Sequence, residues 1–248
     1  MAAPTFHAAG TASGSTGVPT PTMPTFTAGD FILIVTESSS TQDVGTITGY
    51  TQVTGSPVDD GSGSSAGNPR LGVYWRIAQA GDTVPTIPDS GNHTAVQLFS
   101  FSGVDTGSPF SGTPRTDFHS TSTSVSQPGL TTADADCLAV YVLGHAIDSL
   151  TAQLSGQANA SLTSVTERGD FATNANQGGG FAVTTGVKAV AGDTDFMTGT
   201  LAATSKQPML SFALKPPGAA FVPPPSNRRY AGSSTPTPPS QAHTIGWR

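Results

Sequence analysis

Apolar and polar residues alternate along short segments of this chain, and turn-forming residues separate the segments. In the segment 95–101, Val96 and Leu98 share one face of an extended strand, while Phe99 and Phe101 share the other. Both faces are apolar, which predicts a central strand covered on two sides. Helical spacing of apolar residues is nearly absent, because Gly, Pro or Ser/Thr clusters interrupt every segment of twelve or more residues. The pattern therefore predicts strands.

The predicted strands are β-branched or aromatic runs bounded by turn signals such as Asp59-Asp60-Gly61. We expect them at 30–36, 45–53, 70–78, 94–101, 120–126, 137–145, 160–166, 179–190, 196–201 and 209–214. Their spacing of about 15–25 residues, without crossover helices, predicts an all-β fold, an antiparallel jelly-roll or similar Greek-key sandwich. A trimeric β-prism or a β-helix is the weaker alternative, because no 6- or 9-residue repeat is visible.

Two regions depart from the strand pattern. Residues 55–69 form a long polar loop that we expect to project from the sandwich. Residues 216–248 are rich in proline and poor in apolar residues, so they favour extended polyproline II stretches. We therefore divide the chain into a β-sandwich body, 1–215, and an extended Pro-rich basic C-terminal arm, 216–248.

Charge is sparse and unevenly distributed. The chain has 248 residues, of which 10% are charged, against about 25% in an average soluble domain. Residues 1–195 carry all 16 acidic and five basic side chains, a net charge of −11, whereas residues 196–248 carry five basic and no acidic ones, a net charge of +5. An acidic body repels nucleic acid, and the basic residues of the arm are too sparse to follow a phosphate backbone. Nucleic acid is not an expected partner.

Membrane and redox signals are weak as well. No run approaches the roughly 18 consecutive apolar residues of a spanning helix, so we expect no membrane insertion. The first residues lack the basic and apolar regions of a secretory signal, so export by that route is not expected. The single cysteine, Cys137, can form neither an internal disulfide nor a multi-cysteine metal site, and we expect a small buried side chain in a strand.

Local matches to catalytic motifs stand in the wrong context. Gly63–Gly67 satisfies G-x-S-x-G but lies in a Gly/Ser loop rather than between a strand and a helix. Asp105 begins an Asp-Thr-Gly-Ser turn like that of aspartic proteases, yet Asp89 is too near in sequence to supply a second lobe. A homodimeric protease would need Asp105 alone, although the following 109–112 segment is typical of a loop. We expect Asp105 to cap a turn, and the chain not to be an enzyme.

Metal-binding patterns are incomplete. Five histidines are scattered singly, at His7, His93, His119, His145 and His243. The pairs 59/60, 134/136 and 193/195 could each contribute carboxylates to a calcium loop, but none has the full Asp-x-Asp-x-Asp-Gly series. We therefore expect no metal and no cofactor. Trp75 could stack on a sugar, but in an apolar strand it is expected to belong to the core.

One longer pattern carries a resemblance. It consists of Leu98–Pro109 (LFSFSGVDTGSP), preceded by Tyr74-Trp75-Arg76 and followed by Ala133–Val140 (ADADCLAV). This stretch resembles a recurring pattern in structural proteins of tailed bacteriophages and in bacterial surface modules, over roughly residues 25–215. The resemblance implies a β-sandwich used as a virion or adhesion module and supplies no catalytic residues. The arm is not part of the pattern.

The sequence thus predicts a non-enzymatic structural protein of a phage particle, a capsid decoration, cement or tail-associated protein assembled in the host cytoplasm. We expect it to be displayed outward and attached through its arm to other virion proteins and to copies of itself, a trimer being one arrangement. Arg, Tyr and Trp dominate interface hot spots, so the expected partner-binding residues are Arg228, Arg229, Tyr230, Trp247 and Arg248. The alternative is a carbohydrate-binding, host-adhesion module that recognises a host surface glycan through a concave sheet face or the 55–69 loop. That alternative requires exposed aromatic side chains.

Overall fold

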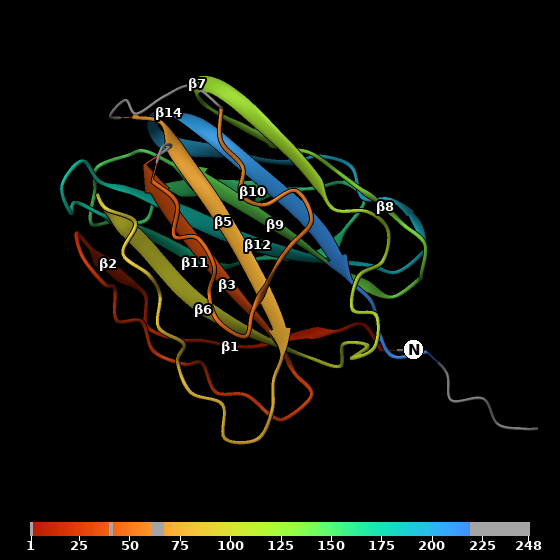
Figure 1. Cartoon of the computed structure of the whole chain (residues 1–248). Coiled ribbons are helices and arrows are strands. Elements are labelled where there is room, and N and C mark those ends of the chain that lie inside the picture. The colour runs from red at the N-terminus through yellow and green to blue at the C-terminus, as the bar shows by residue number, and fades with distance from the viewer. Residues whose placement is uncertain (1, 40–41, 61–66, 219–248) are drawn as a thin grey trace, which may run out of the picture. The chain divides into compact units, whose positions relative to one another are not determined.

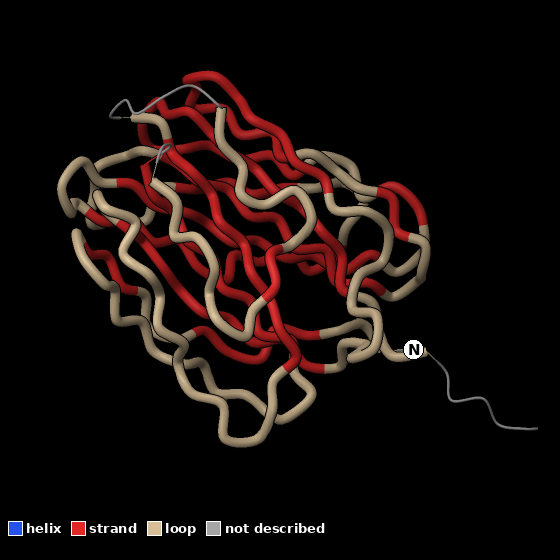
Figure 2. Tube along the Cα trace, in the orientation of Figure 1, coloured by secondary structure: helices blue, strands red, loops and turns tan. Residues whose placement is uncertain are grey.

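The computed structural model describes residues 2–39, 42–60 and 67–218, and these residues form an all-β fold, as predicted (Figure 1). Figure 2 shows strands and loops throughout the described chain. Every pairing between the described strands is antiparallel, and most of the strands belong to two sheets stacked as a sandwich. Within the described ranges, no helix has the length and apolarity that crossing a bilayer requires.

The first sheet has the order β1-β6-β3-β5-β4, and β2 also pairs with β6. Its strands are β1 (Thr5–Ala9), β2 (Ser13–Ser15), β3 (Phe31–Ser39), β4 (Thr51–Gln52), β5 (Pro69–Ile77) and β6 (Thr94–Ser102). All residues of β3 are buried, because β5 and β6 flank the strand and other segments cover both of its faces. β6 lies between β3 and β1 or β2, so the prediction of a central strand there is confirmed.

The second sheet has the order β10-β14-β9-β12-β11, and β7 pairs with β14. Its strands are β7 (Arg115–Gln127), β9 (Cys137–His145), β10 (Leu154–Ala158), β11 (Thr163–Thr173), β12 (Gly179–Lys188) and β14 (Met197–Leu214). Two short strands, β8 (Thr131–Thr132) and β13 (Gly192–Asp193), pair only with each other.

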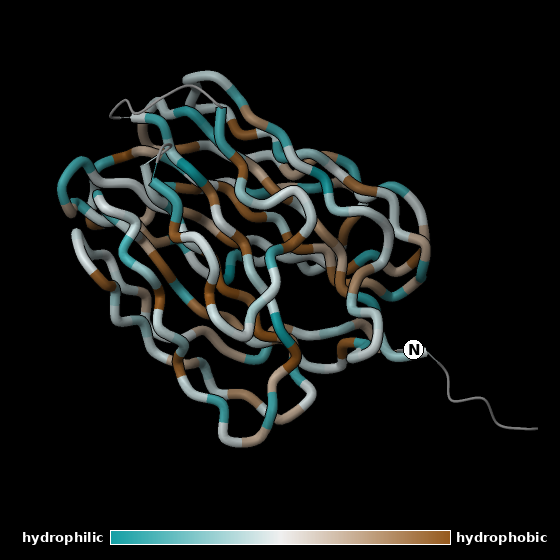
Figure 3. The backbone as a smooth tube through the Cα atoms, in the orientation of Figure 1, coloured by the Kyte–Doolittle hydropathy of each residue, from teal (hydrophilic) through white to brown (hydrophobic). Residues whose placement is uncertain are grey.

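The main core lies between the facing sheets. Phe31 and Phe99 of the first sheet pack with Phe181 and Phe212 of the second, and all four are fully buried. Figure 3 shows brown, hydrophobic positions along the strands. Trp75 stacks on Phe31 with ring centroids 5.5 Å apart and packs against this core, as predicted for it. Each such buried side chain contributes about 1.5–3 kcal/mol to folding.

The outer face of the first sheet is also covered. Ile34 and Leu98 point away from the main core and pack with Ile47 of the loop before β4, while Phe26 of the N-terminal segment packs against the same cluster. These segments explain why both faces of the predicted central strand are apolar. They also account for residues 45–53, which were predicted to be a strand. Only Thr51–Gln52 pair, and the preceding residues turn at Gly49, with a φ of 82°, to cover the sheet.

The loop 55–69 does not project as predicted, at least over its described residues. Val58 is buried and pairs with Leu71 of β5 through two backbone hydrogen bonds of 2.9 Å. Asp60 forms an ion pair with Lys206 of β14 at 2.5 Å. The burial of Val58 and the ion pair between Asp60 and Lys206 thus hold residues 55–60 against the body.

The ribbon formed by β7 and β14 is sharply bent. Register shifts separate Thr200 from Ser205 in β14, which the sequence pattern had predicted as two strands, 196–201 and 209–214. Arg115 at the start of β7 and Pro128 just beyond its end line the same hollow, although a straight strand of this length would hold them roughly 40 Å apart. The ribbon therefore folds back, and Met197 packs on Tyr141, on the face of β9 opposite the main core.

Candidate functional site

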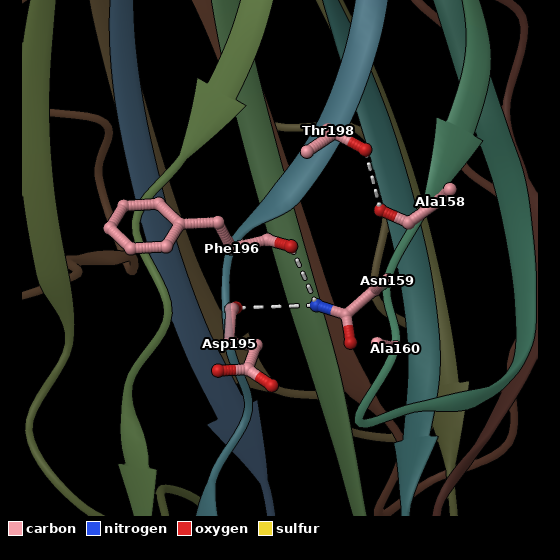
Figure 4. Close-up of a pocket in the computed structure, with 6 residues that line it drawn as sticks. All are labelled: Ala158, Asn159, Ala160, Asp195, Phe196 and Thr198. Atoms are coloured by element: carbon pink, nitrogen blue, oxygen red, sulfur yellow. Dashed lines mark hydrogen bonds between the residues drawn. The ribbon is translucent and has the colours of Figure 1, made fainter.

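Two adjoining hollows share Phe196 and Asp195 at the place where the bent ribbon returns to the second sheet. The first, of about 530 Å³, is lined by Ala158, Asn159, Ala160, Asp195, Phe196 and Thr198 (Figure 4). The second, of about 250 Å³, is lined by Arg115, Pro128, Gly129, Leu130, Thr131, Asp193, Asp195 and Phe196. The start of β7, the segment after β7, the β10–β11 connection and the residues at the start of β14 therefore meet at one surface.

Phe196 is the prominent side chain of this surface. It is 55% exposed, and every other Phe, Tyr and Trp side chain in the described ranges is less exposed. Its neighbour Met197 is fully buried, so the alternation of the strand turns Phe196 outward. Figure 4 shows its ring pointing away from the side chain of Asn159. A large apolar ring is thereby held in solvent between two hollows.

Asn159 fixes the backbone that carries the ring. Its side-chain amide nitrogen donates to the carbonyl oxygens of Thr194 at 2.8 Å, Asp195 at 3.2 Å and Phe196 at 3.1 Å. Its own carbonyl oxygen accepts the backbone N–H of Ser161 at 2.9 Å. One side chain from the β10–β11 connection thus ties down three consecutive residues.

A buried hydroxyl pair supports the same segment from beneath. The Tyr141 hydroxyl lies 2.7 Å from the Thr194 hydroxyl and donates to the Asp195 carbonyl at 3.0 Å. Thr194 is fully buried and accepts the backbone N–H of Leu130 at 3.0 Å. Burial raises the pKa of Tyr141 to about 12, so its hydroxyl keeps its proton and remains a donor at neutral pH. The surface is therefore preformed.

Asp193 and Asp195, one of the three aspartate pairs considered above for a calcium loop, have local roles here. Asp193 accepts the backbone N–H of Asp195 at 3.0 Å, and Asp195 accepts the hydroxyl of Ser161. Asp195 adopts a positive φ of 55°, which Asp tolerates better than most residues. Among the described residues, no group of three or more His, Cys, Asp or Glu side chains could hold a metal ion.

A second group of ionisable side chains is buried at the end of β3. Glu37 is fully buried, and its carboxylate lies 3.1 and 3.3 Å from Nε2 of His93. Burial raises the pKa of Glu37 to about 7, although the hydrogen bond to His93 opposes that rise. Burial lowers the pKa of His93, but the hydrogen bond and charge of Glu37 outweigh it, and the net shift is upward. Neither side chain lines a hollow of the Phe196 surface, and their contact joins β3 to the segment before β6.

Asp105 caps a turn, as predicted. Its carboxylate accepts the backbone N–H groups of Gly107 at 2.9 Å and Ser108 at 3.1 Å, and these bonds hold its pKa below the usual value. Lys215 adds an ion pair at 3.7 Å. Its backbone N–H donates to the Pro109 carbonyl at 3.0 Å, and its carbonyl accepts the N–H of Asp105 at 3.0 Å. The aspartate of the protease-like motif therefore holds the point where the last strand ends.

The remaining sequence predictions divide into two groups. Cys137 is fully buried in β9, as expected. His7 lies 2.7 Å from Asp30, and His119 lies 3.2 Å from Asp117. Outside the described residues lie most of the Gly63–Gly67 motif, His243 and all of the predicted partner-binding residues, Arg228, Arg229, Tyr230, Trp247 and Arg248.

The sequence reading missed the Phe196 surface, because the residues that form it come from separate loops. One local signal was available. Phe196 and Met197 are consecutive large apolar residues at the start of a strand, and consecutive positions face opposite sides, so one of them had to leave the interior. Which of the two side chains is buried is decided by Tyr141, because Met197 packs against it.

Comparison with known proteins assigns no relationship: no protein-family model, curated protein or solved structure matches this chain.

Proposed function

We propose that this chain is a non-enzymatic structural module of a bacteriophage particle, a capsid decoration or tail-associated protein that is displayed outward and attached through residues 216–248. Its site of action would be the virion, and its partners would be other virion proteins and copies of itself. The starting point is the sequence resemblance carried by Leu98–Pro109 and the flanking segments.

The observation that carries the proposal is the anchoring of Lys215. Two backbone hydrogen bonds of 3.0 Å and an ion pair to Asp105 tie this residue to the 105–109 turn, which lies within the resembling pattern. An attachment arm transmits load and position only if its base is fixed, and residue 216 follows directly. The turn thus supports a role in attachment.

The placement of the ionisable groups supports a non-enzymatic role. Catalytic groups must reach a substrate, whereas Glu37 and His145 are fully buried. Burial lowers the pKa of His145 to about 4, so its ring is neutral at physiological pH. The carboxylate of Asp105 already accepts two backbone hydrogen bonds and faces Lys215.

The test compares the full chain with a chain truncated after Gly218, each supplied during infection by the phage that encodes it. We expect the full chain to co-purify with particles. The truncated chain should fold with an unchanged melting temperature, because the main core and the Lys215 contacts are intact, yet be absent from particles. Normal incorporation of the truncated chain would disprove attachment through the arm. Absence of the full chain from purified particles would disprove the proposed function itself.

A further inference from the structure

We propose that the surface around Phe196 is a binding site for a neutral sugar ring of a host surface glycan. This inference rests on the proposed function, because a module displayed on the outside of a particle is in a position to meet the host surface. The site consists of the exposed ring and the two hollows beside it.

The shape and chemistry of the surface match a pyranose ring. One face of such a ring carries C–H groups that pack on an aromatic ring, while its hydroxyl groups project around the edge. Phe196 offers the aromatic face, with more than half of its surface free. Asp195 lines both hollows, and Arg115 lines the second, so an acceptor and a donor flank the ring. A few polar groups around an apolar platform are typical of small-ligand sites.

The backbone that carries Phe196 is held in place, which favours a binding role for the exposed ring. Asn159 bonds three consecutive carbonyl groups around Phe196, and Tyr141 and Thr194 bond the same segment from below. A surface that is already ordered loses little conformational entropy when a ligand binds. Five hydrogen bonds from two side chains thus hold residues 194–196 in place.

Charge selects a neutral ligand over an anionic one. Asp193 and Asp195 both line the second hollow, Asp195 also lines the first, and Arg115 of the second hollow is the one cationic side chain among the residues that line them. The body, residues 1–215, carries 16 acidic and seven basic side chains, a net charge of −9, so its field repels sulfated, phosphorylated or sialylated sugars. Hydroxyl groups, by contrast, can donate to the carboxylates and accept from Arg115.

A protein partner fits this surface less well. Stable protein interfaces bury about 800 Å² on each side around a cluster of apolar anchors. The other exposed large hydrophobic residues of the described chain, Val18, Leu150 and Val190, line neither hollow. A single ring between two small hollows matches the size of one or two sugar units.

The experiment titrates the full chain with neutral oligosaccharides of glucose, galactose, mannose and N-acetylglucosamine, and with sialyllactose as the anionic comparison, by NMR and calorimetry. We expect at least one neutral probe to bind in the millimolar range or tighter, and sialyllactose to bind at least tenfold more weakly. Phe196→Ala should weaken binding at least tenfold, whereas Phe196→Trp should retain it. Val190→Ala, which removes a side chain that is 73% exposed, is the matched control and should bind normally. Equal melting temperatures would show that each variant is folded.

Three results would overturn the inference: no neutral probe binds, the best probe is anionic, or Phe196→Ala binds as tightly as the unaltered chain. Measuring incorporation of each variant into particles distinguishes failure of the sugar site from failure of the proposed function. If Phe196→Ala alone is lost from particles while Val190→Ala is incorporated, Phe196 contacts a neighbouring protein and the sugar site is wrong. If the unaltered chain is absent from particles, the proposed function fails, and the titration still decides the sugar site.

Discussion

At the scale of single residues, Glu37 shows how this fold accommodates a charge in its interior. The residue is fully buried in β3, where a lone carboxylate would be strongly destabilising, and His93 supplies a hydrogen-bonded partner from the segment just before β6. A Cβ at Gly179 of β12 would collide with the Glu37 carboxylate, so the glycine leaves room for it. The pair therefore joins β3 to the segment before β6 within the first sheet, and its carboxylate lies against Gly179 of the second sheet.

The Glu37–His93 pair predicts a pH dependence of stability. Both pKa values are raised above the values of 4.5 and 6.5 expected for the unfolded chain, Glu37 to about 7. A raised pKa means that the folded state holds its proton longer, so stability is complete at low pH and is lost as the pH rises through about 7. The free energy of unfolding should fall by roughly 1–3 kcal/mol between pH 5 and 8. Glu37→Gln should flatten that slope in urea titrations, and a slope unchanged by this substitution would contradict the assignment.

Gly129 gives a second prediction at this scale. A Cβ there would lie 2.5 Å from the carbonyl oxygen of Asp195, and backbone cannot move aside cheaply. We expect Gly129→Ala to lower the free energy of unfolding by about 1–3 kcal/mol and to shift the amide NMR signals of residues 194–196. Gly17→Ala is the control, because the nearest atom to its Cβ is 4.0 Å away. Unchanged signals at Phe196 would show that Gly129 does not shape the candidate site.

At the scale of elements, two backbone amides of β7, a strand at the edge of its sheet, are bonded by side chains of the strand itself. This strand pairs with β14 alone among the described strands. The side chain of Asp117 accepts the backbone N–H of Phe118 at 2.8 Å, and that of Ser122 accepts the N–H of Ser124 at 2.9 Å. These amides are occupied by the strand's own side chains, so they offer nothing to an incoming strand.

Removing those side chains should expose the edge. We expect the double variant Asp117→Ala/Ser122→Ala to remain folded but to form dimers or larger species at concentrations where the unaltered chain keeps its mass. Light scattering during size-exclusion chromatography measures this change. Thr123→Ala, an exposed position on the same strand, is the control and should leave the mass distribution unchanged. An unchanged distribution in the double variant would mean that these bonds do not protect the edge.

Elements differ in how far the sequence alone predicts them. The bounds of β9 are those predicted, Cys137–His145, because it is a continuous apolar run in the middle of a sheet. β10 was missed, since Leu154-Ser-Gly-Gln-Ala has little β-forming character and is held by pairing with β14. The Phe196 surface was missed for a related reason. It depends on the bend in the β7–β14 ribbon, which tertiary packing determines and local alternation does not record.

At the scale of the whole molecule, charge separates the chain into two parts. The net charge of −6 combines the −11 of residues 1–195 with the +5 of residues 196–248. Within the described body, Lys206 and Lys215 already pair with Asp60 and Asp105. The other three basic residues of this segment, Arg228, Arg229 and Arg248, lie outside the described residues. An acidic surface is complementary to this basic segment, so under the proposed attachment through residues 216–248 we expect charge to guide the encounter with the partner.

Comparing how far different arm substitutions reduce incorporation into particles tests whether charge or aromatic burial holds the arm to its partner. Exposed ion pairs contribute only about 0–1 kcal/mol each, whereas a buried tryptophan at an interface contributes about 2 kcal/mol or more. Incorporation into particles should therefore fall further for Trp247→Ala than for Arg228→Ala, and high salt should weaken attachment only in part. Quantifying the chain in purified particles by mass spectrometry, against a major particle protein as internal standard, gives the ranking. If Trp247→Ala leaves incorporation unchanged and salt does not weaken attachment, residues 216–248 make no contribution to attachment. Contact with the particle must then come from the sandwich, residues 1–215.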